Sequence, residues 1–169
     1  MHVRPATDAD LPELARGMKL VIDEERWVAR QPPVTEAELA ENLRARLEEG
    51  HRLIALEDSD AAADDPGALV GLIDLHPTRI DGVHAIGMWI LPGRRGKGGG
   101  RMLIDAAIDG RPADVHKIEL EVWPDNEAAI GLYERSGFQR EGLRRDHYRR
   151  RDGTLRSAVI MARLFPEAF

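Results

Sequence analysis

The chain carries the sequence IGMWILPGRRGKGGGRMLIDAAI at residues 86–108, and this stretch decides the fold class. Its apolar first part predicts a strand, and the periodic apolar residues after position 101 predict a helix. Four of the five residues from 96 to 100 are glycines. A strand, a glycine loop and a helix in this order direct backbone N–H groups and the positive helix end at one point, which suits a phosphate.

Three basic residues accompany the glycines: Arg95, Lys97 and Arg101. An arginine can hold a phosphate through two parallel hydrogen bonds. The loop is therefore interpreted as an anion-binding loop rather than as a flexible turn.

Hydrophobic spacing predicts the surrounding elements. A first helix follows the capping-box pair Thr7 and Asp10 and runs to about Trp27, and a second helix follows Thr35 and Glu38. A third helix follows the glycine loop and ends near residue 110, and a fourth covers residues 127–136. The expected strands are residues 2–5, 52–56, 68–75, 83–91, 117–123, 138–143 and 155–164, and residues 57–67 form an acidic loop. This order, β-α-α-β-β-β-α-β-α-β-β, predicts an α/β fold with a mixed sheet in one domain, residues 1–169.

Composition narrows the function classes. The 169 residues are 43% hydrophobic, which predicts ordinary globular folding. No apolar run approaches the roughly 20 residues of a membrane span, and no signal-peptide pattern is present, so a cytoplasmic protein without membrane partners is expected. The net charge of −6 argues against a nucleic-acid binder, although seven arginines lie between residues 140 and 156.

Other glycine-loop families do not fit. A nucleotide-hydrolase phosphate loop requires Ser or Thr after Gly-Lys, but Gly98 follows Lys97. The dinucleotide fingerprint G-x-G-x-x-G fails from Gly96, because its third glycine falls on Arg101.

A different pair of motifs is present. Arg95, Gly98 and Gly100 form R-x-x-G-x-G, and residues 126–138 form N-x-x-A-x-x-L-Y-x-x-x-G-F. Together they resemble the GCN5-related N-acetyltransferase (GNAT) family over about residues 70–164. Within that family, the chain looks most like the ribosomal-protein N-terminal acetyltransferases. The resemblance implies a mostly antiparallel mixed sheet flanked by helices, with dimers as a common state, so a homodimer is one expected form.

The resemblance implies acetyl-CoA as the co-substrate. The pantetheine arm is expected along Met88 and Ile90, where this strand and residues 119–123 splay apart, and Asn126 is expected to contact that arm or to cap the next helix. The pyrophosphate is expected on the loop formed by Arg95, Gly96, Lys97, Gly98, Gly99, Gly100 and Arg101.

The implied reaction is direct acyl transfer from a thioester to a neutral amine. By its place in the second motif, Tyr133 matches the general acid of the family, and its alternative role is a core aromatic. Glu121 matches the base of the ribosomal-protein branch, with Asp74, His76 and His84 as alternates. A strand amide near Ile90 is the expected oxyanion donor. The chain has no cysteine and no spaced histidine motif, so neither a covalent intermediate nor a metal site is expected.

The sequence does not select which amine accepts the acetyl group. Residues 23–25 are acidic and suit a cationic amine, whereas the arginines of residues 144–151 suit an acceptor with a carboxylate or phosphate. A peptide N-terminus, an amino acid, a polyamine and an antibiotic are all compatible. The alternative function is a non-catalytic acyl-CoA-binding sensor or regulatory domain.

Overall fold

A computed structural model describes residues 1–58 and 68–166. The acidic loop expected at residues 57–67 therefore lies almost wholly outside the described residues. The helices are α1 (Leu11–Asp23), α2 (Glu36–Glu48), α3 (Gly99–Asp109) and α4 (Glu127–Arg135), with a short 3-10 turn at Asp8–Asp10. The strands are β1 (His2–Pro5), β2 (Arg52–Glu57), β3 (Leu69–Pro77), β4 (Val83–Ile90), β5 (Lys117–Val122), β6 (Gln139–Arg149) and β7 (Leu155–Leu164). Among the described residues, no helix has the length and apolarity needed to cross a bilayer.

The sheet is mixed, as predicted. Its seven strands follow the hydrogen-bonded order β1-β2-β3-β4-β5-β7-β6. β4 and β5 pair in parallel, with Val83 opposite Lys117, whereas β1/β2, β2/β3, β5/β7 and β6/β7 are antiparallel. The predicted order of helices and strands and the mostly antiparallel sheet are therefore confirmed, with the 3-10 turn as the one addition.

The first helix ends earlier than the sequence predicts. Thr7 and Asp10 form the expected capping box, but they cap the 3-10 turn that leads into α1. α1 ends at Asp23 instead of Trp27, because Glu25 adopts a left-handed φ of 50° and breaks the helical path. The second capping box is confirmed, since the Thr35 side chain accepts a hydrogen bond from the Glu38 amide.

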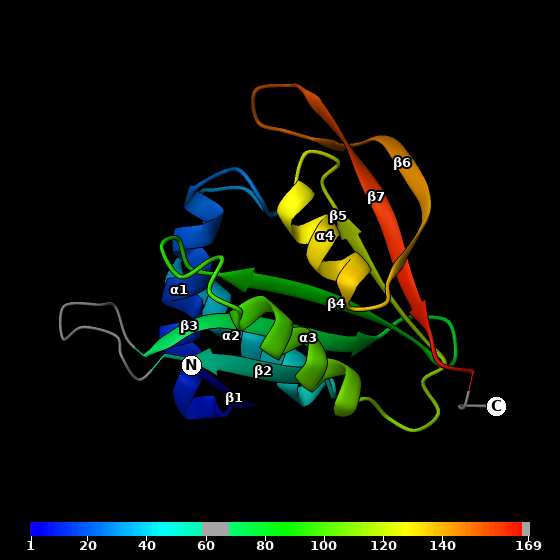
Figure 1. The fold of residues 1–169 in the computed structure, drawn as a ribbon. Coiled ribbons are helices and arrows are strands. Elements are labelled where there is room, and N and C mark those ends of the chain that lie inside the picture. Colours follow the sequence, from blue (N-terminus) through cyan, green and yellow to red (C-terminus); the bar gives the residue numbers. More distant parts are fainter. Residues whose placement is uncertain (59–67, 167–169) are drawn as a thin grey trace. The chain divides into compact units, whose positions relative to one another are not determined.

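Contacts group the chain into two compact units, residues 1–76 with 87–110, and residues 77–86 with 111–169. In the first unit, α3 lies over β1 and β2, while α1 and α2 pack together behind the strands (Figure 1). The helix α1 approaches β4 closely at Gly17: a Cβ added there would lie 2.7 Å from the Cη2 atom of Trp89. The contact requires a residue without a side chain at this position.

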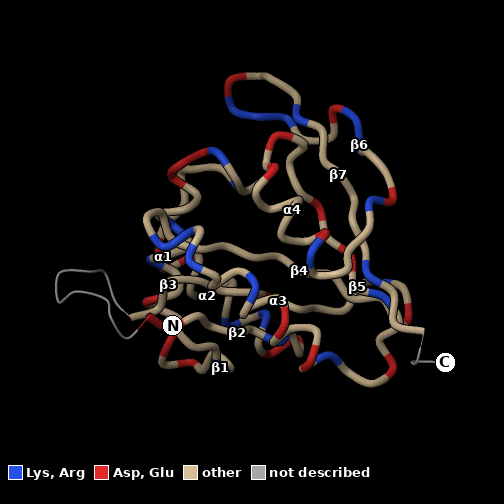
Figure 2. The backbone as a smooth tube through the Cα atoms, in the orientation of Figure 1, with Lys and Arg blue, Asp and Glu red and all other residues tan. Residues whose placement is uncertain are grey.

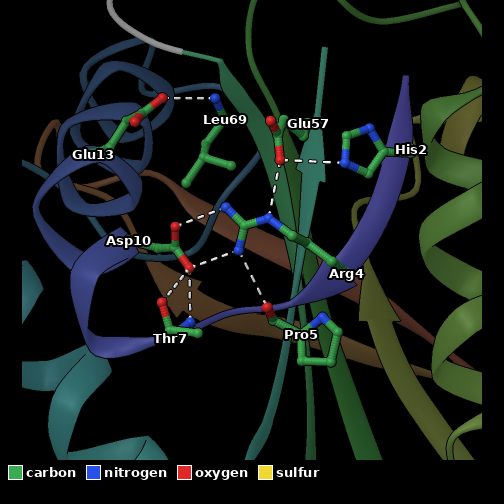
Figure 3. A network of polar contacts seen from close by, with 8 residues as sticks. All are labelled: His2, Arg4, Pro5, Thr7, Asp10, Glu13, Glu57 and Leu69. Carbon is green, nitrogen blue, oxygen red and sulfur yellow. Dashed lines mark hydrogen bonds and ion pairs between the residues drawn. The ribbon is translucent and has the colours of Figure 1, made fainter. Parts of the chain in front are cut away.

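A polar network fixes the start of the first unit (Figure 3). The Arg4 guanidinium on β1 donates to Asp10 at 2.8 Å and to Glu57 on β2 at 2.9 Å. The hydrogen bond from Arg4 holds the pKa of Asp10 well below its usual range, so this carboxylate is ionised at neutral pH. Nearby, the Glu13 carboxylate of α1 accepts from the Leu69 amide at 2.6 Å, which ties α1 to the start of β3.

In the second unit, β6 is longer than predicted. The sequence predicts a strand over residues 138–143, but β6 continues to Arg149 through exposed, charged residues. Their pairing with β7, rather than their own hydrophobicity, keeps them extended, and the register shifts between Arg144 and Tyr148. Asp146 lies in this shift with a φ of 50°, and its amide donates to the Ser157 hydroxyl at 3.0 Å.

The close packing of α1 predicts the effect of one substitution. Gly17→Ala forces a methyl group into the Trp89 ring, and overpacking of this kind costs about 1–3 kcal/mol. This cost exceeds the gain of about 1 kcal/mol that alanine brings to a helix. We expect a lower free energy of unfolding, measured by urea denaturation.

Gly131→Ala in α4 is the matched control. Its added Cβ would meet only the mobile end of the Arg135 side chain, at 3.2 Å. This variant keeps the helix-propensity gain, so its stability should be equal to or above that of the parent protein. Stabilisation by both substitutions would contradict the tight α1–β4 contact.

Candidate active site

The glycine loop begins α3 with backbone that favours glycine. Gly96 and Gly98 have φ values of 76° and 89°, and Gly98 is the N-cap of α3. A Cβ added at either position would meet nothing within 4 Å, so the loop is open on this side. Gly99 is different, because a Cβ there would collide with the Leu56 side chain of β2. The first amides of a helix have no carbonyl one turn earlier, so those of α3 are available to an anion.

The three basic residues of the loop are used differently. The Arg95 guanidinium donates to the Ile90 carbonyl at 2.9 Å and to the Glu24 carboxylate at the end of α1. Arg101 donates to Asp105, one turn further along α3, at 2.8 Å. Lys97 is exposed and has no hydrogen-bond or ion-pair partner among the residues that the structure describes. Its ammonium group is therefore available to a ligand, while Arg95 mainly holds the loop against α1 and β4.

Successive side chains of β4 point to opposite faces of the sheet. Trp89 is buried and contacts α1, whereas Met88 and Ile90, the expected neighbours of a pantetheine arm, are half-buried on the other face. The Trp89 indole nitrogen is fully enclosed and has no hydrogen-bond partner in the described chain. These residues all belong to the first unit.

The remaining predicted residues belong to the second unit. Asn126 caps α4, since its side-chain oxygen accepts from the Ala129 amide at 3.3 Å, so the helix-cap role considered from the sequence is confirmed. Tyr133 lies on α4 with its ring against Phe138, at 5.8 Å between centroids. Its hydroxyl makes no hydrogen bond to a described residue. Burial raises the pKa of Tyr133 to about 12, so the phenol carries its proton at neutral pH.

Glu121 on β5 is held by two residues of β6. Its carboxylate contacts the Arg144 guanidinium at 2.8 Å and accepts a hydrogen bond from the Tyr148 hydroxyl at 2.9 Å. Both side chains reach across β7, which lies between β5 and β6. The sequence does not predict these contacts with Glu121, because they depend on the register shift in β6 between Arg144 and Tyr148.

Arginines gather along β6 and the β6–β7 connection (Figure 2). Several are paired within the unit: Arg140 contacts Glu134, and Arg156 contacts Asp125 and stacks over Trp123 at 4.6 Å. Tyr148 packs edge-on against the same Trp123 ring at 5.1 Å. The Trp123 indole nitrogen is enclosed and has no hydrogen-bond partner among the described residues.

Two of the alternate bases lie elsewhere, on β3 in the first unit. Asp74 is buried, and it accepts hydrogen bonds from Arg46 at 2.9 Å and from His51 at 3.0 Å. Burial alone would raise the pKa of Asp74, but contact with His76 and the charges of His51 and Arg46 outweigh it and keep the pKa below its usual value. His51, Asp74 and His76 thus form one cluster, which a search for spaced motifs missed because His51 comes from a different element.

Comparison with known proteins identifies the family to which this chain is related. The family model described as Acetyltransferase (GNAT) family matches residues 19–138. The chain is also similar to the N-alpha-acetyltransferase RimI of Mycobacterium tuberculosis, with 46% identity over 67 residues. That alignment covers 40% of this chain and 40% of the relative, so it spans less than half of the relative's length.

Solved structures share the fold. A ribosomal-protein-alanine N-acetyltransferase from Brucella melitensis has a TM-score of 0.84 at 22% identity, over 98% of this chain and 100% of that one. A phosphinothricin acetyltransferase from Sinorhizobium meliloti, in complex with AcCoA, has a TM-score of 0.78 at 19% identity, over 98% and 88%. At these identities the likeness concerns the fold.

The contact between Tyr148 and Glu121 predicts a pH titration. Partial burial, the hydrogen bond to Glu121 and the negative charge of Glu121 raise the pKa of Tyr148. Glu121→Gln removes that charge, so the tyrosinate forms more readily and the pKa of Tyr148 should fall. The chain has two tyrosines, so ultraviolet absorbance of tyrosinate can follow both ionisations.

The control is Tyr133→Phe, which should remove only the ionisation near pH 12. An unchanged ionisation of Tyr148 in Glu121→Gln would show that Tyr148 does not bond to Glu121 in solution.

Proposed function

The chain belongs to the GNAT family of acetyltransferases, and on this basis we propose that it transfers the acetyl group of acetyl-CoA directly to a primary amine. When bound, acetyl-CoA supplies an activated thioester, and the protein supplies binding, orientation and proton transfer. The observation that carries the proposal is the glycine loop at the start of α3, which presents open backbone and a free lysine to an anion.

The loop is proposed to hold the pyrophosphate of the co-substrate. The left-handed glycines Gly96 and Gly98 allow close approach to the main chain, and the amides of Gly99 and Gly100, in the first turn of α3, have no carbonyl one helical turn earlier. Lys97 adds a positive charge without losing an internal ion pair. Gly99 sets the position of the helix by packing on Leu56. The residues present therefore fit a diphosphate group.

Tyr133 is proposed as the general acid that protonates the departing thiolate. Its buried phenol holds the proton at neutral pH, and its hydroxyl makes no hydrogen bond to a described residue. The raised pKa secures the protonated form but reduces the tendency to release the proton, so the transfer requires a strongly basic thiolate at the moment of bond cleavage.

Glu121 is proposed as the base that accepts a proton from the amine. An attacking amine must be neutral, and the usual pKa is about 8 for an α-amino group and about 10.4 for lysine. Both oxygens of Glu121 are already engaged, one by Arg144 and one by Tyr148. Proton acceptance therefore requires one of these partners to release its oxygen.

We propose that residues 1–169 form one N-acetyltransferase domain, which the near-complete coverage by the Brucella enzyme structure supports. The acceptor class remains a peptide N-terminus, an amino acid, a polyamine or an antibiotic. The RimI relative makes a peptide α-amine the first acceptor to test. The assay measures thiol release from acetyl-CoA with a panel of these amines. Tight acetyl-CoA binding without turnover on the panel would favour the sensor function instead.

Tyr133→Phe tests the acid. Removal of one hydroxyl should lower kcat at least tenfold, because the thiolate then leaves without a positioned proton donor, while the Kd for CoA stays nearly unchanged. Circular dichroism checks the fold, since Tyr133 also packs on Phe138. A folded variant with parental kcat would contradict the assignment.

Gly98→Asp tests the loop. The substitution places a carboxylate where the pyrophosphate is expected and strains a φ of 89°, so the affinity for CoA should fall at least tenfold. Gly50→Asp is the matched control, because Gly50 has a φ of 84° and similarly open surroundings at the end of α2. Calorimetry should show parental CoA affinity for this control. Equal losses in both variants would mean that strain, not the loop, decides binding.

A further inference from the structure

A cluster of two histidines and one aspartate lies in the first unit, apart from the residues assigned to acetyl transfer above. Asp74 and His76 are two positions apart on β3, so their side chains share one face of the strand. The antiparallel register pairs Leu53 with Asp74 and Arg52 with Leu75. Continued by one residue, this register places His51 opposite His76. The fold therefore brings the three side chains together without any local sequence motif.

The donor atoms lie at distances that suit a metal ion. One ligand atom from each of the three residues falls within 4.8 Å of the others. The Asp74 Oδ1 atom is 3.0 Å from His51 Nδ1 and 3.5 Å from His76 Nδ1. Tetrahedral zinc, with bonds of about 2.0–2.1 Å, separates neighbouring ligand atoms by about 3.3–3.4 Å. The two distances from Asp74 lie on either side of that value, and the donor atoms of the two histidines lie within 4.8 Å of each other.

His76 contributes a polar atom without a close hydrogen bond. Its Nδ1 atom is enclosed, and its contact with Asp74 Oδ1 is an ion-pair contact at 3.5 Å, which is too long for a good hydrogen bond. Enclosed polar atoms in folded proteins nearly always have a partner, and a bound ion is one way to provide it. The ring of His76 stacks on that of His51 at 4.8 Å, so it is already held toward the cluster.

Other side chains orient the ligands as they do around known metal sites. Arg46 holds the Oδ2 atom of Asp74 at 2.9 Å, and Oδ1 is the oxygen nearer to His51 Nδ1, at 3.0 Å against 3.2 Å for Oδ2. The Nε2 atom of His51 faces the Glu49 carboxylate at 3.7 Å, while its Nδ1 faces Asp74. A carboxylate behind a ligating histidine fixes the orientation of the ring. The His76 side chain is 31% exposed, so the cluster lies near the surface of the first unit.

We propose that His51, Asp74 and His76 bind a divalent cation of the zinc class, with water in the fourth position. Two imidazoles and one carboxylate favour zinc over magnesium or calcium, which prefer oxygen ligands. The bound ion joins the segment after α2 to β3, and so acts as a structural clamp on the first unit. The proposal does not depend on acetyl transfer.

The test uses tag-free protein, stripped with a chelator and then titrated with zinc chloride by calorimetry. We expect one zinc ion per chain with micromolar or tighter affinity, little binding of magnesium, and a higher Tm with zinc. Cobalt chloride should give the visible absorption bands of a tetrahedral site. Failure to bind zinc below millimolar concentration would overturn the proposal.

Alanine variants test which residues bind the zinc ion. His76→Ala and His51→Ala should each weaken zinc binding at least tenfold and remove the rise in Tm. His76→Ala is the variant expected to fold most readily, because His76 lies near the exposed end of β3. His147→Ala, at an exposed histidine of β6, is the matched control and should bind zinc like the parent protein. Parental affinity in the His51 and His76 variants would place the ion elsewhere and contradict the proposal.

Discussion

The start of α3 depends on two consecutive glycines, the first for its backbone conformation and the second for its close packing. Gly98 takes a left-handed φ of 89° at the N-cap, and Gly99 packs directly on the Leu56 side chain of β2. The first condition turns the chain sharply into the helix, and the second sets how closely the helix approaches the strand. Together they fix where the free amides of the helix end point, and the proposed pyrophosphate site follows from that direction.

The charges near the candidate site are mostly balanced within the protein. Arg95 is held by Glu24, Arg101 by Asp105, and Glu121 by Arg144. A paired guanidinium contributes less to a ligand than its presence in a motif suggests, because the ligand must compete with the internal carboxylate. In the loop, the attraction for an anion therefore rests mainly on backbone amides and Lys97. In the second unit, the same pairing holds Glu121 in one orientation.

Local signals predicted most of the elements and failed where long-range pairing decides. The Thr35–Glu38 capping box, the alternation of β5 and the glycine before α3 correctly located these elements, because each depends on neighbouring residues. The last six residues of β6 carry no hydrophobic alternation, and only their partner β7 makes them a strand. The early end of α1 follows from the backbone at Glu25, for which the acidic run gave no signal.

The sequence by itself determined the fold class and the glycine loop before α3, since these follow from residue types at fixed spacing, and its resemblance to the GNAT family named Tyr133 as the candidate acid. Tertiary structure alone decided which charges are free and which histidines meet. Arg95 is held because Glu24 and the Ile90 carbonyl lie beside it, whereas Lys97 has no partner among the described residues. His51 joins Asp74 and His76 through strand register. Such contacts join residues far apart in the sequence, and hydrophobic periodicity carries no information about them.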